Sequence, residues 1–218
     1  MAGEPDIDSM YAYYDAKLKK YATGGFDGGD EDYVEKTAKN ILDATILDKE
    51  TGLPWAYTVT NHGDDEGEET AWAIGETADL EHWDGSGNMI SEAEYITSIF
   101  YLSDKQEDML GKFFIMGDKY FILSRLRKLS QLNSVTADLE SEYDESLLPV
   151  ISGASGKYAI YAMQTNKVIV ITMADKEKHD VSYAKKAMGE LVKHLMEKES
   201  EYGDQHPYDA DPVDGDDF

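Results

Sequence analysis

The 218-residue chain contains no cysteine. Disulfides, thiolate metal sites and thiol nucleophiles are therefore excluded, and a reducing, cytoplasmic setting fits. Long apolar runs are lacking as well, since no stretch approaches the roughly 18 consecutive apolar residues of a transmembrane helix. The first ten residues have neither a basic region nor an apolar stretch, so we expect no signal peptide. Apolar residues still make up 41% of the chain, which is enough for a hydrophobic core.

Basic residues are scarce: 20 Lys and Arg stand against 45 Asp and Glu, giving a formal net charge of −25. Two segments without any Lys or Arg account for most of the excess. Residues 61–94 contain eleven acidic residues, and residues 199–218 contain eight. Phosphate groups would be repelled, so we expect no nucleic-acid partner, and phosphoinositide membranes are disfavoured. The acidity is interpreted as belonging to an insertion and a tail, and a salt-rich habitat is the alternative explanation.

Helices are predicted near both ends of the chain. Residues 9–22 have helical character with Ser9 as the N-cap, and residues 182–202 form the clearest amphipathic pattern. One face of the first helix carries Tyr11, Tyr14 and Leu18. The apolar stripe of the last helix consists of Ala184, Met188, Leu191 and Leu195. Shorter helices are predicted over residues 33–42 and 69–80.

A third strong helix is predicted over residues 91–102. Ser91 and Glu94 have the spacing of a capping box, in which each side chain bonds the other residue's backbone N–H. The apolar face of this helix consists of Ile96, Ile99, Phe100 and Leu102.

Most of the remaining sequence has the pattern of β-strands. Residues 44–60 read as a hairpin whose polar turn ends in Gly52. Five β-rich runs follow in the second half, at residues 112–117, 119–126, 134–141, 158–165 and 167–174. Strand and helix do not alternate as in a parallel nucleotide-binding sheet. The order predicts an α+β fold with an antiparallel sheet flanked by terminal helices.

Residues 83–95, WDGSGNMISEAEY, are similar to a calcium loop. If Asp84 takes the first position, Met89 falls where the sharp turn needs glycine, and Glu94 arrives one residue early. We therefore interpret this stretch as a Gly-rich turn followed by a capped helix. His62 and His82 lie among carboxylates, but nothing in the spacing fixes a metal geometry, and we predict no specific metal site.

Catalytic motifs are not formed. Ser152 and Ser155 lie in SGASGK, which lacks both the nucleophile-elbow pattern and the spacing of a phosphate loop, so a tight Gly-rich turn is predicted there. We expect neither an enzyme nor a cofactor.

Six stretches, in order along the chain, resemble the profilin family; they are residues 10–18, 44–58, 90–100, 115–123, 153–176 and 188–202. Tyr11 and Tyr14 take the places of a Trp and a Tyr in the family's opening helix, and Trp55 begins the second strand of the first hairpin. The strand entry and the closing helix match at Gly117, Lys119, Tyr120, His194, Leu195 and Tyr202. Divergent profilins of apicomplexan or Asgard-archaeal type are similar in carrying acidic insertions.

The resemblance implies a profilin-like sheet with the N- and C-terminal helices on one face and shorter helices on the other. It implies a domain over residues 9–202, with an N-terminal extension (1–8), an acidic insertion at about 61–88 and an acidic tail (203–218). The implied activity is binding of monomeric actin, and hence regulation of actin polymerisation, by a monomeric cytoplasmic protein of the cytoskeleton.

Two binding surfaces follow from the resemblance. Proline-rich proteins would stack on flat aromatic faces and meet hydrogen-bond donors. The residues implied for this surface are Tyr11, Tyr14, Trp55, His194, Leu195 and Tyr202. Actin is acidic and would be met by basic residues. The residues implied for that surface are Arg125, Arg127, Lys128, Lys157, Lys178 and His179.

Two other functions fit the residues. A longin- or roadblock-like scaffold that binds small GTPases would have a similar order of helices and strands, without requiring the aromatic residues to converge. A calcium-responsive binding protein would use the acidic insertion.

Overall fold

The computed structural model describes residues 7–22, 41–58, 81–83, 89–103, 113–116, 119–126, 151–177 and 181–202. The helices are α1 (Ile7–Ala22), α3 (Glu92–Ser103) and α5 (Ser182–Tyr202). The strands are β1 (Ile41–Asp48), β2 (Pro54–Tyr57), β3 (Glu81–Trp83), β4 (Met89–Ser91), β5 (Phe113–Met116), β6 (Lys119–Leu126), β7 (Ile151–Ser155), β8 (Tyr158–Gln164) and β9 (Val168–Asp175).

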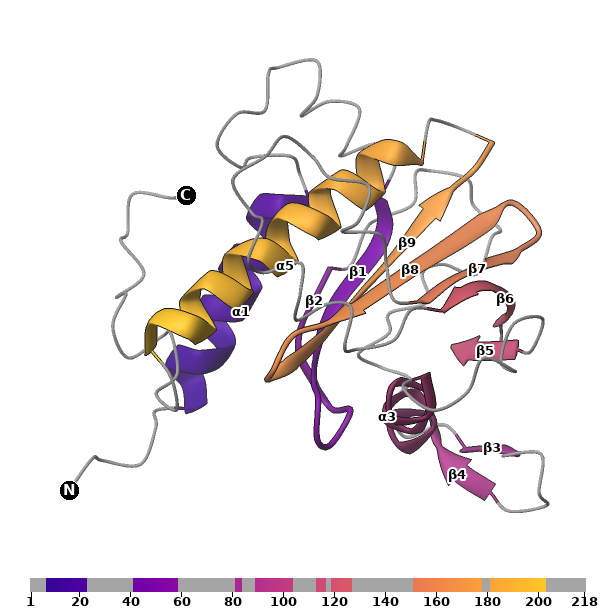
Figure 1. The fold of residues 1–218 in the computed structure, drawn as a ribbon, viewed down its shortest axis with the longest axis horizontal. Helices are drawn as coiled ribbons and strands as arrows, with labels where there is room; N and C mark the ends of the chain where they lie inside the picture. Colours follow the sequence, from indigo (N-terminus) through magenta and orange to yellow (C-terminus); the bar gives the residue numbers. More distant parts are fainter. Residues whose placement is uncertain are drawn as a thin grey trace, which may run out of the picture.

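Seven strands form one sheet in the order β2-β1-β9-β8-β7-β6-β5, and every pair of neighbours is antiparallel. Consecutive strands are neighbours except at the pairing of β1 with β9, which joins the two ends of the chain in the middle of the sheet (Figure 1). β3 and β4 form a separate two-stranded hairpin. The predicted α+β class with an antiparallel sheet and terminal helices is confirmed.

The centre of the sheet is buried on both faces. All eight residues of β9 and seven of the eight residues of β1 are buried. Alternate residues of a strand point to opposite faces, so continuous burial requires cover on both sides. The β-branched side chains of these strands suit such a surface. The long pairing of β1 with β9, from Ile41↔Ala174 to Asp48↔Val168 with one register shift between Ile41 and Asp43, therefore organises the core.

α1 and α5 lie side by side over one side of the sheet, and the start of α1 lies close to the end of α5 (Figure 1). The predicted stripe of α5 is confirmed, because all four of its members are in the hydrophobic core. α5 also has the predicted bounds.

Two details predicted for α1 are wrong. The helix begins at Ile7, so Ser9 lies inside it and is not the N-cap. Tyr11 is 42% exposed, whereas Tyr13, Tyr14 and Leu18 are buried. Three tyrosines within four residues leave the inward face undetermined by sequence, and packing against α5 and β2 decides it.

The capping box of α3 is confirmed. The Glu94 N–H donates to Ser91 Oγ at 3.2 Å, and the Ser91 N–H donates to Glu94 Oε2 at 3.2 Å. The predicted apolar residues Ile96, Ile99 and Phe100 are buried. Trp83 ends β3, so a strand stands where a calcium-binding EF-hand needs its entering helix.

The hairpin of β1 and β2 is confirmed, and its turn rests against α3. Gly52 has a φ of 71°, and a Cβ built on it would lie 2.5 Å from the Ala93 carbonyl oxygen. Glycine is required here both by backbone conformation and by the close approach of α3. This contact fixes the hairpin relative to the start of α3.

Other predictions have mixed outcomes. Residues 152–157 were interpreted as a tight turn; residues 152–155 belong to β7, and the turn lies at Gly156, with a φ of 54°. Ile41 and Leu42 belong to β1 instead of a helix, and Ile41 pairs with Ala174 of β9. The rest of the helix predicted over residues 33–42, the helix predicted at 69–80 and the strand predicted at 134–141 lie outside the described residues.

No helix in the described ranges is long and apolar enough to cross a membrane.

Candidate functional site

Five aromatic side chains gather where α1, α5 and β2 meet. We call Tyr13, Tyr14, Tyr21, Trp55 and His194 the aromatic cluster. Tyr14 and Tyr21 are seven residues apart, so helical periodicity places them on the same side of α1, about two turns from each other. Trp55 comes from β2, and His194 from the middle of α5. Three elements distant in sequence therefore contribute to one cluster.

The cluster is joined by ring contacts. The ring centroids of Tyr14 and Trp55 are 5.0 Å apart with a tilt of 43°, and those of Tyr13 and Tyr14 are 5.3 Å apart at 86°, an edge-to-face arrangement. The rings of Tyr21 and His194 are 5.8 Å apart. Such pairs contribute about 0.5–1.5 kcal/mol each beyond the burial of their area. The cluster therefore holds the terminal helices together and also concentrates aromatic surface beside β2.

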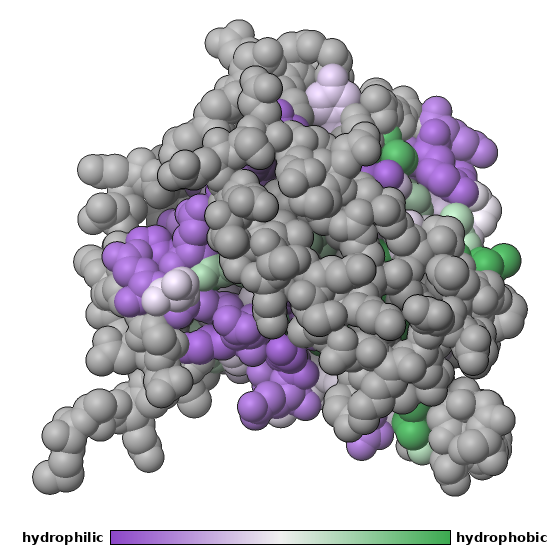
Figure 2. Space-filling model, viewed as in Figure 1, coloured by the Kyte–Doolittle hydropathy of each residue, from purple (hydrophilic) through white to green (hydrophobic). Residues whose placement is uncertain are grey.

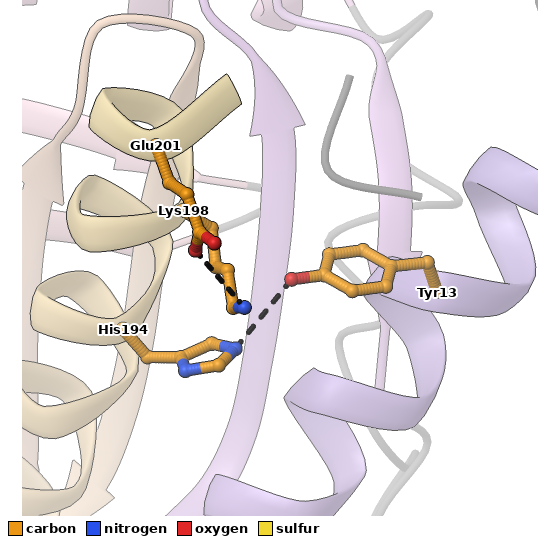
Figure 3. Close-up of polar contacts among 4 residues, drawn as sticks. All are labelled: Tyr13, His194, Lys198 and Glu201. Atoms are coloured by element: carbon orange, nitrogen blue, oxygen red, sulfur yellow. Dashed lines mark hydrogen bonds and ion pairs between the residues drawn. The ribbon is translucent and has the colours of Figure 1, made fainter. Parts of the chain in front are cut away.

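A polar contact crosses from α1 to α5 within the cluster. The Tyr13 hydroxyl lies 3.5 Å from Nε2 of His194 (Figure 3). Lys198, one turn beyond His194 on α5, points its ammonium group toward the same place and pairs with Glu201 at 3.3 Å. On α1, Nζ of Lys17 lies 5.4 Å from the centre of the Tyr13 ring, within reach of a cation–π contact. Cationic side chains from both helices thus lie beside the aromatic rings.

The residues implied for proline binding are distributed unevenly. Tyr14 and Trp55 are in contact, and His194 meets α1 through Tyr13 and Tyr21. Leu195 is 1% exposed and belongs to the core. Tyr11 is on the exposed side of α1, and Tyr202 is the last residue of α5.

Tyr13 and Tyr21 were missed by sequence reasoning. Both reach His194, which had been paired in the prediction with Tyr11 and Tyr14. A signal was available for Tyr21: positions 10, 14, 17, 18 and 21 are spaced by three and four residues, and this spacing places Tyr21 on the same side of the helix as Tyr14 and Leu18.

The residues implied for actin binding are only partly within the described ranges. Arg125 pairs with Ser152 beside a β-bulge in β6, whereas Lys157 lies in the turn beyond the other end of β7. The structure thus separates these two along the sheet. Nζ of Lys157 lies 5.3 Å from the Tyr158 ring centre, and the Lys157 carbonyl accepts the Lys176 N–H at 2.8 Å. Arg127, Lys128, Lys178 and His179 lie outside the described residues.

A buried carboxyl anchors the last turns of α5 to the sheet. Glu199 is 5% exposed and accepts hydrogen bonds from the Thr165 hydroxyl and from the Asn166 N–H, the latter at 2.9 Å. Burial raises the pKa of Glu199, and these hydrogen bonds partly oppose the rise. In α3, burial raises the pKa of Tyr95 to about 12. Neither group lies among the implied binding residues.

On the face drawn in Figure 2, described residues are mostly hydrophilic, and hydrophobic residues form small separate spots. Large exposed apolar side chains are found on several elements, namely Tyr11, Leu53, Tyr57, Met89 and Ile122. Within the described ranges, no three His, Asp or Glu side chains gather in a way that could hold a metal ion.

No protein-family model matches the chain, and no curated protein matches it. Similar solved structures are profilins. Acanthamoeba castellanii profilin II is 11% identical with a TM-score of 0.45, and 84% of this chain and 97% of that chain are covered. Schizosaccharomyces pombe profilin is 13% identical with a TM-score of 0.47 and the same coverage. Acanthamoeba castellanii profilin IA is 14% identical with a TM-score of 0.41, covering 72% and 86%. Structural similarity at this low identity does not show what this chain binds or which of its residues take part in binding.

Proposed function

We propose that this protein binds monomeric actin as profilins do, and so regulates actin polymerisation. It acts by stoichiometric binding and not by catalysis, as a monomer in the cytoplasm. One observation carries the proposal. The sequence stretches that resemble profilins fall, in order, on α1, the β1–β2 hairpin, α3, the strands of one sheet and α5. Trp55, the mark of the first hairpin, contacts Tyr14 of the opening helix at 5.0 Å between ring centroids.

A second activity, binding of proline-rich peptides, is favoured by the aromatic cluster. A polyproline helix is recognised by aromatic side chains with polar tips, because its rings stack on flat faces and its carbonyls accept hydrogen bonds. Trp55 of β2 and His194 of α5 are partly exposed and offer such groups. Tyr13 and Tyr14 are each 1% exposed, so they support the cluster from beneath and do not themselves offer a face.

The actin proposal is tested by spontaneous polymerisation of pyrene-labelled actin from the same source as this chain. We expect a dose-dependent lengthening of the lag, because bound monomers do not nucleate filaments. Arg125→Glu combined with Arg127→Glu should abolish the effect if the basic residues meet the acidic surface of actin.

The matched control is Lys17→Glu combined with Lys19→Glu on α1, which changes the net charge equally on the terminal-helix side. This control should retain the effect. A lag that is unchanged by the wild-type protein at any ratio, with the protein folded, would contradict the proposal and favour the GTPase-scaffold alternative. If both double variants lose the lengthening of the lag equally, Arg125 and Arg127 are not specific to the actin-binding surface.

A further inference from the structure

The aromatic cluster has a cationic border in a strongly acidic protein. Lys17 lies 5.4 Å from the Tyr13 ring centre on the α1 side. On the α5 side, Lys198 is directed toward Tyr13 and His194 (Figure 3). The side chain of Lys198 retains 22% of its exposure, and its partner Glu201 is 58% exposed. A ligand with aligned negative charges and prolines would therefore meet both charge and aromatic complementarity at this place.

The chain contains a segment with this composition. Residues 203–218, GDQHPYDADPVDGDDF, carry six aspartates and no Lys or Arg. They also carry Pro207 and Pro212, two of the five prolines of the chain. The segment begins where α5 ends, at Tyr202, next to the start of α1 (Figure 1).

We propose that residues 203–218 bind back across the aromatic cluster and its lysines, and thereby compete with external proline-rich peptides. The inference rests on the proposed proline-binding function, because it names the occupant and the regulation of that same site. The prolines would lie against Tyr21, Trp55 and His194, the partly exposed members of the cluster, and the aspartates would lie near Lys17 and Lys198.

The length of the segment permits this path. His194 lies eight residues before Tyr202, which is about 12 Å along a helix at 1.5 Å per residue. Pro207 and Pro212 are five residues apart, or about 15 Å in a polyproline II conformation. The segment can turn at Gly203 and run back along α5 as far as His194 with residues to spare.

Tethering makes even weak binding effective. A short flexible linker gives an effective concentration in the millimolar range. A segment with an intrinsic Kd of about 1 mM would then weaken the binding of an external peptide by roughly two- to ten-fold. Screening by salt would reduce this effect, because the contacts of Lys17 and Lys198 lie near the surface.

The first experiment measures binding of an uncharged proline decamer by calorimetry to three full-length proteins. One is the wild type, one has the six tail aspartates changed to asparagine, and the matched control has six insertion carboxyls changed to amides. The changed insertion residues are Asp64, Asp65, Glu66, Glu68, Glu69 and Glu76. Only the tail variant should bind the decamer more tightly, by two- to ten-fold at low salt, and the gain should shrink at high salt.

The outcomes separate the two proposals. Equal affinity of all three proteins for the decamer would overturn the tail proposal and leave proline binding intact. Equal tightening in the tail variant and the insertion control would reduce the effect to overall charge and would also overturn it. Binding by none of the three would contradict the proposed proline-binding function.

A second measurement detects the contact without any peptide. The chain has no cysteine, so Asp214→Cys provides a unique site for a spin label in the full-length protein. We expect the label to broaden amide NMR signals of α1 and α5 around Lys17 and Lys198, and to lose this effect in Lys17→Glu combined with Lys198→Glu. Signals unaffected on both helices, or affected equally over the whole sheet, would overturn the proposal.

Discussion

The contact of the β1–β2 turn with α3 makes a quantitative prediction about Gly52. In Gly52→Ala, the new Cβ would lie 2.5 Å from the Ala93 carbonyl oxygen and 2.9 Å from its carbonyl carbon. Both atoms belong to the backbone, so the first turn of α3 or the hairpin must move. Overpacking of this kind costs about 1–3 kcal/mol. The left-handed backbone conformation costs a further 1–2 kcal/mol, roughly, for a residue with a Cβ.

Gly156 provides the matched control. Its φ is 54°, but a Cβ built there meets no atom within 4 Å. Gly156→Ala should therefore lower the free energy of unfolding only through the left-handed backbone conformation, by about 1–2 kcal/mol. Gly52→Ala adds the overpacking cost and should lower it by about 2–5 kcal/mol.

The assay is urea unfolding of both variants, followed by circular dichroism, with the slopes compared to confirm that the transition is unchanged. Equal losses of unfolding free energy at the two positions would refute the close packing of the hairpin against α3. A larger loss at Gly156 would refute it more strongly.

Three further outcomes are expected. Ser91→Ala removes the side-chain acceptor of the α3 capping box and should lower the unfolding free energy by about 1 kcal/mol, while Ser9→Ala inside α1 should change it little in the same unfolding assay. Leu195→Ala should lower the unfolding free energy by about 2–5 kcal/mol, because this side chain is in the core; wild-type stability would contradict its burial. Because the fold raises the pKa of Glu199, protonation stabilises the folded state, so this contribution is fully present below pH 4.5 and is lost as the pH rises through the raised pKa. Glu199→Gln should remove that dependence, and parallel stability–pH profiles of the two proteins would contradict it.

Long periodic elements were predictable from sequence because their signals are local. α5 has an apolar stripe over about three turns, from Ala184 to Leu195, and α3 has a capping box in addition to its apolar face. The β1–β2 hairpin is marked by a polar turn with Gly52 between apolar runs. In each case the sequence pattern agrees with the burial of the side chains, so the predicted element is present in the structure.

Short strands and the direction of individual side chains depend on distant partners. β7 contains Gly153 and two serines, a composition that indicates a turn, yet it pairs with β8 along its whole length and with β6 from Ile151 to Ala154. β3 and β4 have three residues each, too few for a period of two to be detected. Such segments become strands because neighbouring strands offer backbone hydrogen bonds.

In the candidate site, too, some residues could be predicted from the sequence and others depend on distant parts of the chain. Trp55 and His194 were found from the resemblance, and the structure brings both to α1. Spacing along α1 could have indicated Tyr21, whereas Tyr13 was missed because the position of α5 decides that it meets His194. The proposed basic surface depends on residues that pairing in β6 and β7 distributes along the sheet, and sequence spacing alone did not predict that separation.

The most direct test of the account is whether the protein forms a complex with monomeric actin. We would measure sedimentation velocity of fluorescently labelled monomeric actin, from the same source as the chain, with increasing amounts of the full-length protein. The account predicts a saturable shift of actin to a faster-sedimenting species with one copy of each protein. Actin that sediments as the free monomer at every concentration of the folded protein would contradict it.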